Sequence, residues 1–377
     1  MADEPFVPYL CTMEIDKNTL IKALAGVKDP HTGQDLITAN RVRDLEVDGA
    51  NVRFTLELPN LNNDYKSQLN FACQEAILAH YPQANVHVHM MSHTAESQES
   101  TSPLPHVQNI IAVGSGKGGV GKSTVAVNLA LGLRALGARV GLLDADLYGP
   151  SIPTMLGLAG QRPKIETIHG QPKIMPLEAH GIYTMSIGFI IEAEQAVVLR
   201  GPRLSGIIRQ FINDTVWPPL DYLIVDLPPG TGDIQLTLVQ TVPLTGAILV
   251  TTPQQVALDD AIKAMNMLFL PNINIPVLGV VENMAWFTPA ELPNNKYYIF
   301  GQGAGAKLAK ASNSMLLGQV PLVQGIRESG DAGVPAMLNK ADTISRPVFL
   351  KIAQNTVRQL ALRNEMMGPS QVVKVQS

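Results

Sequence analysis

The sequence predicts an α/β protein in which a mostly parallel, doubly wound sheet follows a smaller α/β domain. From residue 107 to 366, short apolar runs alternate with helical stretches, which is typical of a parallel sheet with helices on both faces. A polar stretch at 92–105, rich in Ser and Thr and closed by prolines, indicates a linker. We therefore expect a small α/β domain at 1–92, a linker at 93–106, a larger domain at 107–366 and a tail at 367–377.

The front domain is expected to combine two helices with three strands. Its apolar residues change from helical to strand spacing along the chain, and Asp29-Pro30 marks a turn after the first helix. The pattern predicts helices at 18–27 and 65–80 and strands at 45–47, 52–58 and 85–90.

The larger domain begins with a buried strand at 109–113, a glycine-rich segment and a helix at 124–136 with its apolar residues on one face. Gly137 ends that helix at a favoured capping position. A long helix at 344–364 is expected to close the domain. Further strands are predicted at 140–143, 182–185, 222–225, 247–250, 277–281 and 316–320.

The glycine-rich segment, GSGKGGVGKST at 114–124, contains the Walker A pattern G-x-x-x-x-G-K-[ST]. Glycines let backbone N–H groups turn toward a polyphosphate, Lys122 would reach the β- and γ-phosphates, and the Ser123 hydroxyl would bind Mg²⁺. The following helix would direct its positive end at the phosphates. The sequence thus predicts a P-loop NTPase fold that binds ATP. The residues expected to contact the nucleotide are Gly116, Lys117, Gly118, Gly119, Val120, Gly121, Lys122, Ser123 and Thr124.

The same segment raises one alternative, a dinucleotide-binding fold, because Gly114, Gly116 and Gly119 also satisfy G-x-G-x-x-G. Such a fold places an acidic residue about 20 residues further on. Asp144 lies beyond that distance, and the Lys122-Ser123 pair would have no role. The residues therefore favour a triphosphate site over a nicotinamide or flavin site.

Carboxylates follow two of the predicted strands. Asp144 and Asp146 come after 140–143, and Asp226 comes directly after 222–225. Parallel α/β sheets gather their active sites at the C-terminal ends of strands, and an aspartate after an apolar strand suits a Walker B carboxylate. One of Asp144 and Asp146 can complete the Mg²⁺ shell while the other orients the attacking water. The alternative for Asp146 is that it only caps the following turn.

Composition excludes several other classes of protein. A formal charge of -4 argues against a nucleic-acid-coating surface, and no run of about 18 apolar residues could span a membrane. The acidic N-terminus has no leader pattern, so we expect a cytoplasmic protein that binds neither nucleic acid nor membrane. Cys11 and Cys73 are too few for a disulfide scaffold. His87, His89 and His93 are interpreted as an exposed strand end, because no acidic or thiol partner lies nearby.

Four motifs resemble one known family. GKGGVGKST, DADLYGPSIP, RGP at 200–202 and DLPPGTGDIQLTLVQ are similar to those of the Mrp/ApbC family of ATP-binding iron–sulfur cluster carriers, over about 107–366. The front domain resembles the small α/β domain often fused before such proteins. The wider group includes MinD, ParA and the nitrogenase iron protein, which are ATP-dependent dimers with a deviant Walker A. The resemblance implies a homodimer that closes around ATP, hydrolyses it slowly and passes clusters to iron–sulfur apoproteins or assembly scaffolds.

The resemblance also implies roles for individual residues. Lys117 would reach across the dimer to the partner's nucleotide and act with Lys122 in catalysis. Asp146 would position the attacking water, and Asn283 would contact adenine. The Mg²⁺ shell would comprise Ser123, Asp144 and Asp226.

The sequence departs from the family at the cluster itself. Relatives that carry a cluster have a C-x-x-C shortly after the position of Met284, whereas 285–292 contains no cysteine. Thiolates are the usual ligands of iron–sulfur centres. Three interpretations stay open, namely a labile cluster bound through Cys11 or Cys73, a scaffold for clusters held elsewhere, and a role outside cluster work. A MinD- or ParA-like positioning ATPase and a nucleotide-gated adaptor are the alternative functions, and the single lysine in 368–377 disfavours a membrane-binding tail.

Overall fold

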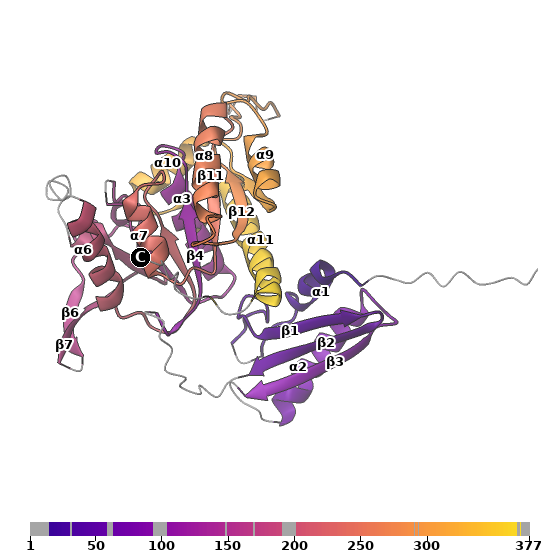
Figure 1. The fold of residues 1–377 in the computed structure, drawn as a ribbon. Coiled ribbons are helices and arrows are strands. Elements are labelled where there is room, and N and C mark those ends of the chain that lie inside the picture. Colours follow the sequence, from indigo (N-terminus) through magenta and orange to yellow (C-terminus); the bar gives the residue numbers. More distant parts are fainter. Residues whose placement is uncertain are drawn as a thin grey trace, which may run out of the picture. The chain divides into compact units, whose positions relative to one another are not determined.

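The chain forms two compact units (Figure 1). One unit runs from Met1 to Glu96 and takes in Asn364–Met366, and the other comprises Ser97–Arg363 and Met367–Ser377. Most of the predicted linker and of the predicted tail lies outside the residues that the structure describes. The computed structural model describes residues 15–30, 32–58, 63–92, 104–147, 149–168, 170–190, 201–289, 291–292, 294–367 and 370.

The front unit is a three-stranded sheet with two helices. Strand β2 lies between β1, to which it is antiparallel, and β3, to which it is parallel. Helix α2 packs against α1 and β3, and Asp16 caps α1 by accepting a 3.0 Å hydrogen bond from the Thr19 amide. Leu20 of α1, Phe54 of β2 and Ile77 of α2 are buried in its core. The elements are α1 (Lys17–Leu24), β1 (Val42–Asp48), β2 (Asn51–Leu58), α2 (Asn63–Leu78) and β3 (Asn85–Ser92).

The second unit is built on an eight-stranded sheet in the order β13-β12-β11-β4-β10-β5-β9-β8. Every neighbouring pair is parallel except β8 and β9. Strands β10 and β11 are buried along their whole length, as continuous apolar runs in a parallel sheet require. The strands are β4 (Val107–Gly114), β5 (Val140–Asp144), β8 (Leu177–Ala179), β9 (Ile182–Ser186), β10 (Leu220–Asp226), β11 (Gly246–Thr251), β12 (Val277–Glu282) and β13 (Met315–Gln319). The predicted fold class is confirmed.

Helices connect the successive parallel strands of the sheet, whereas a short turn joins β8 and β9. Gly132 of α3 leaves room for a close approach to α11, because a Cβ there would lie 2.9 Å from that of Ala353. The helices are α3 (Lys122–Ala135), α4 (Ile152–Met155), α6 (Gly201–Asp214), α7 (Asp233–Thr241), α8 (Gln255–Leu268), α9 (Ala304–Ala311), α10 (Gln324–Asp331) and α11 (Ser345–Met366), with short 3₁₀ turns η1 (Ile187–Phe189) and η2 (Ala336–Leu338).

The sequence did not predict the antiparallel hairpin of β6 (Lys164–Ile168) and β7 (Gln171–Met175). Most residues of β6 are exposed, including Ile165, so the strand lacks the contrast between a buried and an exposed face on which a sequence pattern depends.

Candidate nucleotide-binding site

The glycine-rich segment connects the end of β4 to the first residue of α3. Gly119 and Gly121 have a φ of 81°, in the left-handed region that favours glycine. Gly116 lies directly against α8, where an added Cβ would overlap the backbone of Asp260 and Ala261. The Ser115 carbonyl accepts a 2.9 Å hydrogen bond from the Gly230 amide, which ties the loop to the segment after β10. At these positions the glycines are required by backbone conformation or by close packing.

Lys122 and Ser123 both contact one buried carboxylate at the base of the loop. The Lys122 ammonium lies 2.8 Å from Asp226 Oδ1 and 3.4 Å from Asp146 Oδ2, and its side chain is only 6% exposed. The Ser123 hydroxyl donates a 2.6 Å hydrogen bond to Asp226 Oδ2. Asp226 therefore fixes the two side chains that the Walker A pattern singles out.

Asp144 lies beside Asp226, because their Cα positions are paired across β5 and β10. Its carboxylate is fully buried and accepts hydrogen bonds from the Ser186 hydroxyl, at 2.8 Å, and the Asp146 amide, at 3.1 Å. Burial, together with the negative charge of Asp226, raises the pKa of Asp144 to about 8. Burial also raises the pKa of Asp226, although the Lys122 ammonium opposes that shift.

Ser186 is a contact that sequence reasoning missed. It ends β9, where its Cα pairs with that of Asp144, and its oxygen also accepts a 3.0 Å hydrogen bond from the Gly188 amide. The turn that follows packs against the segment after β5, since a Cβ on Gly188 would lie 2.9 Å from Pro150 Cβ. A serine at the end of a predicted strand was the only available signal, and it did not indicate which neighbouring strand it would face.

The loop borders a cavity of about 250 Å³ that opens beside this charged cluster. Lys117 lines the cavity with a half-buried side chain, and its carbonyl accepts a 2.9 Å hydrogen bond from the Ser115 hydroxyl. Other lining residues are Gly118, Gly119, Gly121, Lys122, Ser123, Thr124, Asp146, Gly149, Ser151 and Pro229. The cavity thus combines glycine backbone with one buried cation and suits a polyphosphate.

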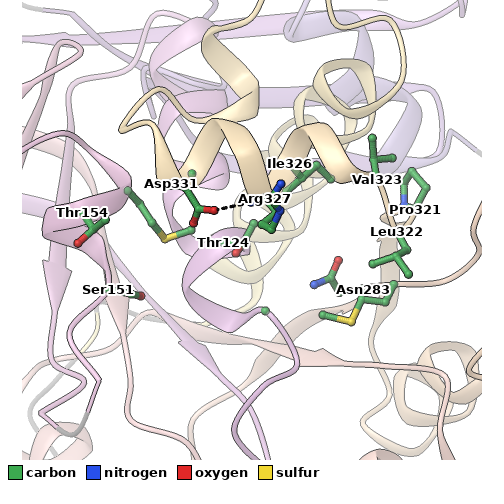
Figure 2. Close-up of a pocket in the computed structure, with 14 residues that line it drawn as sticks. Thr124, Ser151, Thr154, Asn283, Pro321, Leu322, Val323, Ile326, Arg327 and Asp331 are labelled. Carbon is green, nitrogen blue, oxygen red and sulfur yellow. Dashed lines mark hydrogen bonds and ion pairs between the residues drawn. The ribbon is translucent and has the colours of Figure 1, made fainter.

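A second cavity of about 470 Å³ adjoins the first and shares Gly121, Thr124 and Ser151 with it. Figure 2 shows Ser151 and Thr154 on one side and the segment Pro321–Val323 on the other, with Asn283 facing the space between. Helix α10 supplies Ile326, Arg327 and Asp331, the last two joined by a 2.9 Å ion pair. This mixed apolar and polar wall, most of which the sequence did not predict, has the character of a nucleoside site.

Asn283 connects the second cavity to the loop. Its side-chain amide donates a 2.9 Å hydrogen bond to the Val120 carbonyl, and the residue is buried. A Cβ on Gly121 would overlap the Asn283 amide, so glycine at this position makes the contact possible. Asn283 thus lines the second cavity and contacts the loop that borders the first.

The segment after Met284 forms an aromatic hairpin. Phe287 and Tyr297 exchange backbone hydrogen bonds of 2.9 and 2.8 Å, and the Lys296 ammonium lies 4.1 Å from the centre of the Trp286 ring. Tyr298 and Ile299 extend into solvent, the latter with 60% exposure. Aromatic and aliphatic side chains therefore occupy the stretch in which the resemblance would place a thiolate pair.

Other residues noted in the sequence lie away from the site or outside the described residues. Cys73 is a buried free cysteine of α2, whereas Cys11 and His93 are not described. His87 and His89 are exposed on β3. In the RGP motif, Arg200 lies outside the described residues and 201–202 begin α6. Within the described ranges, no three His, Cys, Asp or Glu side chains are arranged to hold a metal ion, and no helix is long and apolar enough to cross a membrane.

The parallel sheet, the glycine loop and the buried lysine–carboxylate cluster together define a P-loop NTPase. The chain belongs to the family described as NUBPL iron-transfer P-loop NTPase, whose model matches residues 106–357. A second model, described as iron–sulfur cluster assembly protein, matches residues 17–89. These matches confirm the family resemblance drawn from the motifs.

Individual relatives agree with this family. The chain is 43% identical over 347 residues to an iron–sulfur cluster carrier protein of Synechocystis, covering 92% of this chain and 98% of the relative. A nucleotide-binding protein from Archaeoglobus fulgidus, solved with ADP, is 36% identical with a TM-score of 0.53 over 61% of this chain and 88% of that one. The cell division ATPase MinD of Pyrococcus furiosus shares the fold at 22% identity, with a TM-score of 0.50 over 66% of this chain and 98% of that one.

Proposed function

We propose that this chain is an ATP-hydrolysing carrier or scaffold for iron–sulfur clusters, which dimerises around ATP and helps deliver clusters to apoproteins. The observation that carries the ATP part is the contact of Asp226 with both Lys122 and Ser123 beneath a glycine-lined cavity. The cluster part is supported by the iron-transfer family and by relatives named as cluster carriers. ATP turnover is assigned to the domain at 107–366 and not to the front domain at 1–92.

The residues present fit a Mg²⁺ ion bound with the nucleotide. Ser123, Asp144 and Asp226 offer hydroxyl and carboxylate oxygens, and Mg²⁺ is usually held by one or two carboxylates together with substrate phosphates. The 2.6 Å contact between Ser123 and Asp226 brings two of these donors to one point. When bound, the ion would neutralise charge on the phosphate oxygens.

Slow hydrolysis is supported by the ion pairs that the charged side chains of the site already form with one another. Lys122 is already paired with Asp226 and lies within 3.4 Å of Asp146, so a triphosphate must compete with buried carboxylates for the ammonium. Asp146 lines the same cavity as the loop glycines, a position from which it could orient a water toward the γ-phosphate. The nucleobase would occupy the adjoining cavity beside Asn283.

Dimerisation is assigned to Lys117, which lines the cavity but is not among the residues that contact Asp226. Its half-exposed side chain is available to reach a nucleotide bound by a second copy. This charge would stabilise the dimer only while phosphate is present, so association should follow the nucleotide state.

Steady-state ATP hydrolysis and light scattering test the proposal together. Asp146→Ala should lower kcat by about 10²-fold, within the range for loss of a general acid–base or water-positioning group, while ATP still binds. Lys117→Ala should abolish the dimer that a non-hydrolysable ATP analogue induces in the wild type, whereas Lys307→Ala, at an exposed lysine of α9, should not. Equal hydrolysis by wild type and Asp146→Ala, or an unchanged dimer in Lys117→Ala, would show the assigned role to be wrong.

Cluster delivery needs its own assay. Wild-type protein supplied with iron and sulfide should restore activity to the apo form of an iron–sulfur enzyme, and Lys122→Gln should not. Failure of the wild type to raise transfer above protein-free solution would remove the carrier function while leaving the ATPase assignment intact.

A further inference from the structure

Cys73, one of the two cysteines in the chain, is enclosed in the core of the front unit. Tyr65, Leu69, Cys73 and Ile77 recur every four residues along α2, and this spacing turns all four toward the core. The Cys73 side chain is 0% exposed. Burial raises the pKa of its thiol to about 12, so the thiolate that iron would bind is strongly disfavoured in the folded protein.

The remaining thiolate supply is too small for a cluster. With Cys73 enclosed, each chain has at most Cys11, and two chains together have at most two thiolates where a [2Fe–2S] or [4Fe–4S] cluster ordinarily takes four. The aromatic hairpin after Met284 contains no cysteine. Among the described residues, no third His, Cys, Asp or Glu side chain completes a metal site with His87 and His89.

We infer that any iron–sulfur cluster this protein carries is completed by thiolates from outside the chain, supplied by a low-molecular-weight thiol or by cysteines of the protein that gives or receives the cluster. The inference rests on the proposed function and narrows it. The chain then acts as an ATP-driven scaffold around a cluster whose thiolate ligands come from other molecules.

The chemistry is ligand exchange without oxidation or reduction. Each outside thiol loses its proton to solvent and binds iron as a thiolate in place of a solvent ligand. When a recipient thiolate replaces it, that iron–sulfur bond breaks and the released thiolate takes up a proton from solvent. Neither iron nor sulfur changes oxidation state. ATP binding would contribute only by bringing together the two copies that enclose the cluster.

Anaerobic reconstitution of the full chain with iron and sulfide tests the inference. A phosphine keeps the cysteines reduced in a first arm that contains no thiol, glutathione is present in a second, and a cluster-loaded protein with cysteine ligands is present in a third. Bound iron, sulfide and visible absorption are measured after gel filtration. We expect iron at background level in the first arm and a bound cluster in the second or third, which identifies the source of the thiolates.

Two results would overturn the inference. One is a stoichiometric cluster in the thiol-free arm, and its loss or survival in Cys73→Ala would show whether Cys73 is one of its ligands. The other is the absence of a cluster from all three arms, since outside thiolates would then fail to complete a site. Reaction of Cys11→Ser protein with a thiol reagent supplies an independent check, because Cys73 should react only after unfolding. ATP hydrolysis by the same samples separates these outcomes from failure of the ATPase assignment.

Discussion

Lys122, the first residue of α3, and Asp226, the last residue of β10, form a buried ion pair of 2.8 Å. The pair connects the phosphate loop to the neighbouring strand of the sheet and keeps a cation beneath the glycines before any nucleotide arrives. A buried ion pair contributes little net stability, but removal of one partner leaves an uncompensated charge. The same contact therefore governs both the integrity of the empty site and its affinity for ATP.

Replacement of Lys122 should reveal both roles. Lys122→Gln leaves Asp226 buried without its cation, and we expect the free energy of unfolding to fall by about 3–5 kcal/mol, as for other broken buried pairs. ATP binding should also be lost. The double variant Lys122→Gln with Asp226→Asn should recover most of the stability without recovering ATP binding. Chemical unfolding and calorimetric titration measure the two effects, and an unchanged unfolding curve in Lys122→Gln would contradict the first.

The glycines of the loop give a matched pair of variants. Gly121→Ala places a methyl group against the Asn283 amide at a φ of 81°, whereas Gly118→Ala meets no atom within 4 Å. Strain at a left-handed residue costs about 1–3 kcal/mol, so Gly121→Ala should weaken ATP binding by about tenfold or more. In chemical unfolding, the free energy of unfolding should fall by about 1–3 kcal/mol in Gly121→Ala. It should stay within about 0.5 kcal/mol of the wild-type value in Gly118→Ala, because the added methyl group meets no atom of the protein. Equal losses in the two variants would show that the close approach at Gly121 has no effect.

Local pattern was sufficient to predict the strand, loop and helix that hold phosphate. The glycine spacing and the change from strand to helical periodicity lie within about thirty consecutive residues, and β4 and α3 follow them closely. The sequence also indicated that Asp144 and Asp226 would lie at the same edge of the sheet, because parallel strands bring their C-terminal ends to one edge.

Contacts that depend on strand order could not be predicted in the same way. Ser186 reaches Asp144 only because β9 is the neighbour of β5 in the sheet. Residues of α10 form a wall of the second cavity although they lie some 200 positions beyond the loop. The sequence of α10, QGIRESGD, is polar apart from Ile326 and its glycines, so no local signal distinguishes a cavity wall from a surface helix.

The raised pKa of Asp144 predicts how stability depends on pH in the absence of nucleotide. Its carboxyl holds a proton up to about pH 8 when folded and, like an ordinary aspartate, only to about pH 4 when unfolded. The folded state therefore binds more protons between these values, and stability from this group is complete below about pH 4 and is lost as pH rises toward 8. The loss can reach about 1.4 kcal/mol per pH unit.

Asp144→Asn removes the titrating carboxyl group, so the stability of this variant should fall less steeply than that of the wild type as pH rises. Thermal unfolding of both proteins from pH 5 to 8 measures this effect. The melting temperature of the variant minus that of the wild type should rise steadily with pH. A constant difference in melting temperature across that range would mean that Asp144 does not hold the proton. Mg²⁺ must be chelated throughout, because a bound cation would favour the ionised carboxylate.

The hydrogen bond from Ser186 to Asp144 predicts a positioning role for this serine. Asp144 has two hydrogen-bond donors, the Ser186 hydroxyl on one oxygen and the Asp146 amide on the other, so the serine helps fix the direction in which the carboxylate points. In Ser186→Ala the buried Asp144 side chain loses one hydrogen bond, at a cost of about 1 kcal/mol while the carboxyl is protonated in the nucleotide-free protein. The cost rises to about 1.5–3 kcal/mol, as for a hydrogen bond to a charged group, when a bound Mg²⁺ keeps the carboxylate ionised. If Asp144 belongs to the Mg²⁺ shell, the Mg²⁺ concentration that half-activates ATP hydrolysis should rise about tenfold.

The structure supplies a control on the same strand. Thr184 is also fully buried, but its hydroxyl has no hydrogen-bond partner, so Thr184→Val removes a hydroxyl from β9 without disturbing Asp144. Ser186→Thr keeps the donor and should restore the Mg²⁺ dependence. A purely structural role would lower the melting temperature of Ser186→Ala while the Mg²⁺ requirement stayed that of the wild type. Nucleotide affinity without Mg²⁺ should be similar in all four proteins, because Ser186 acts through the carboxylate and touches neither cavity.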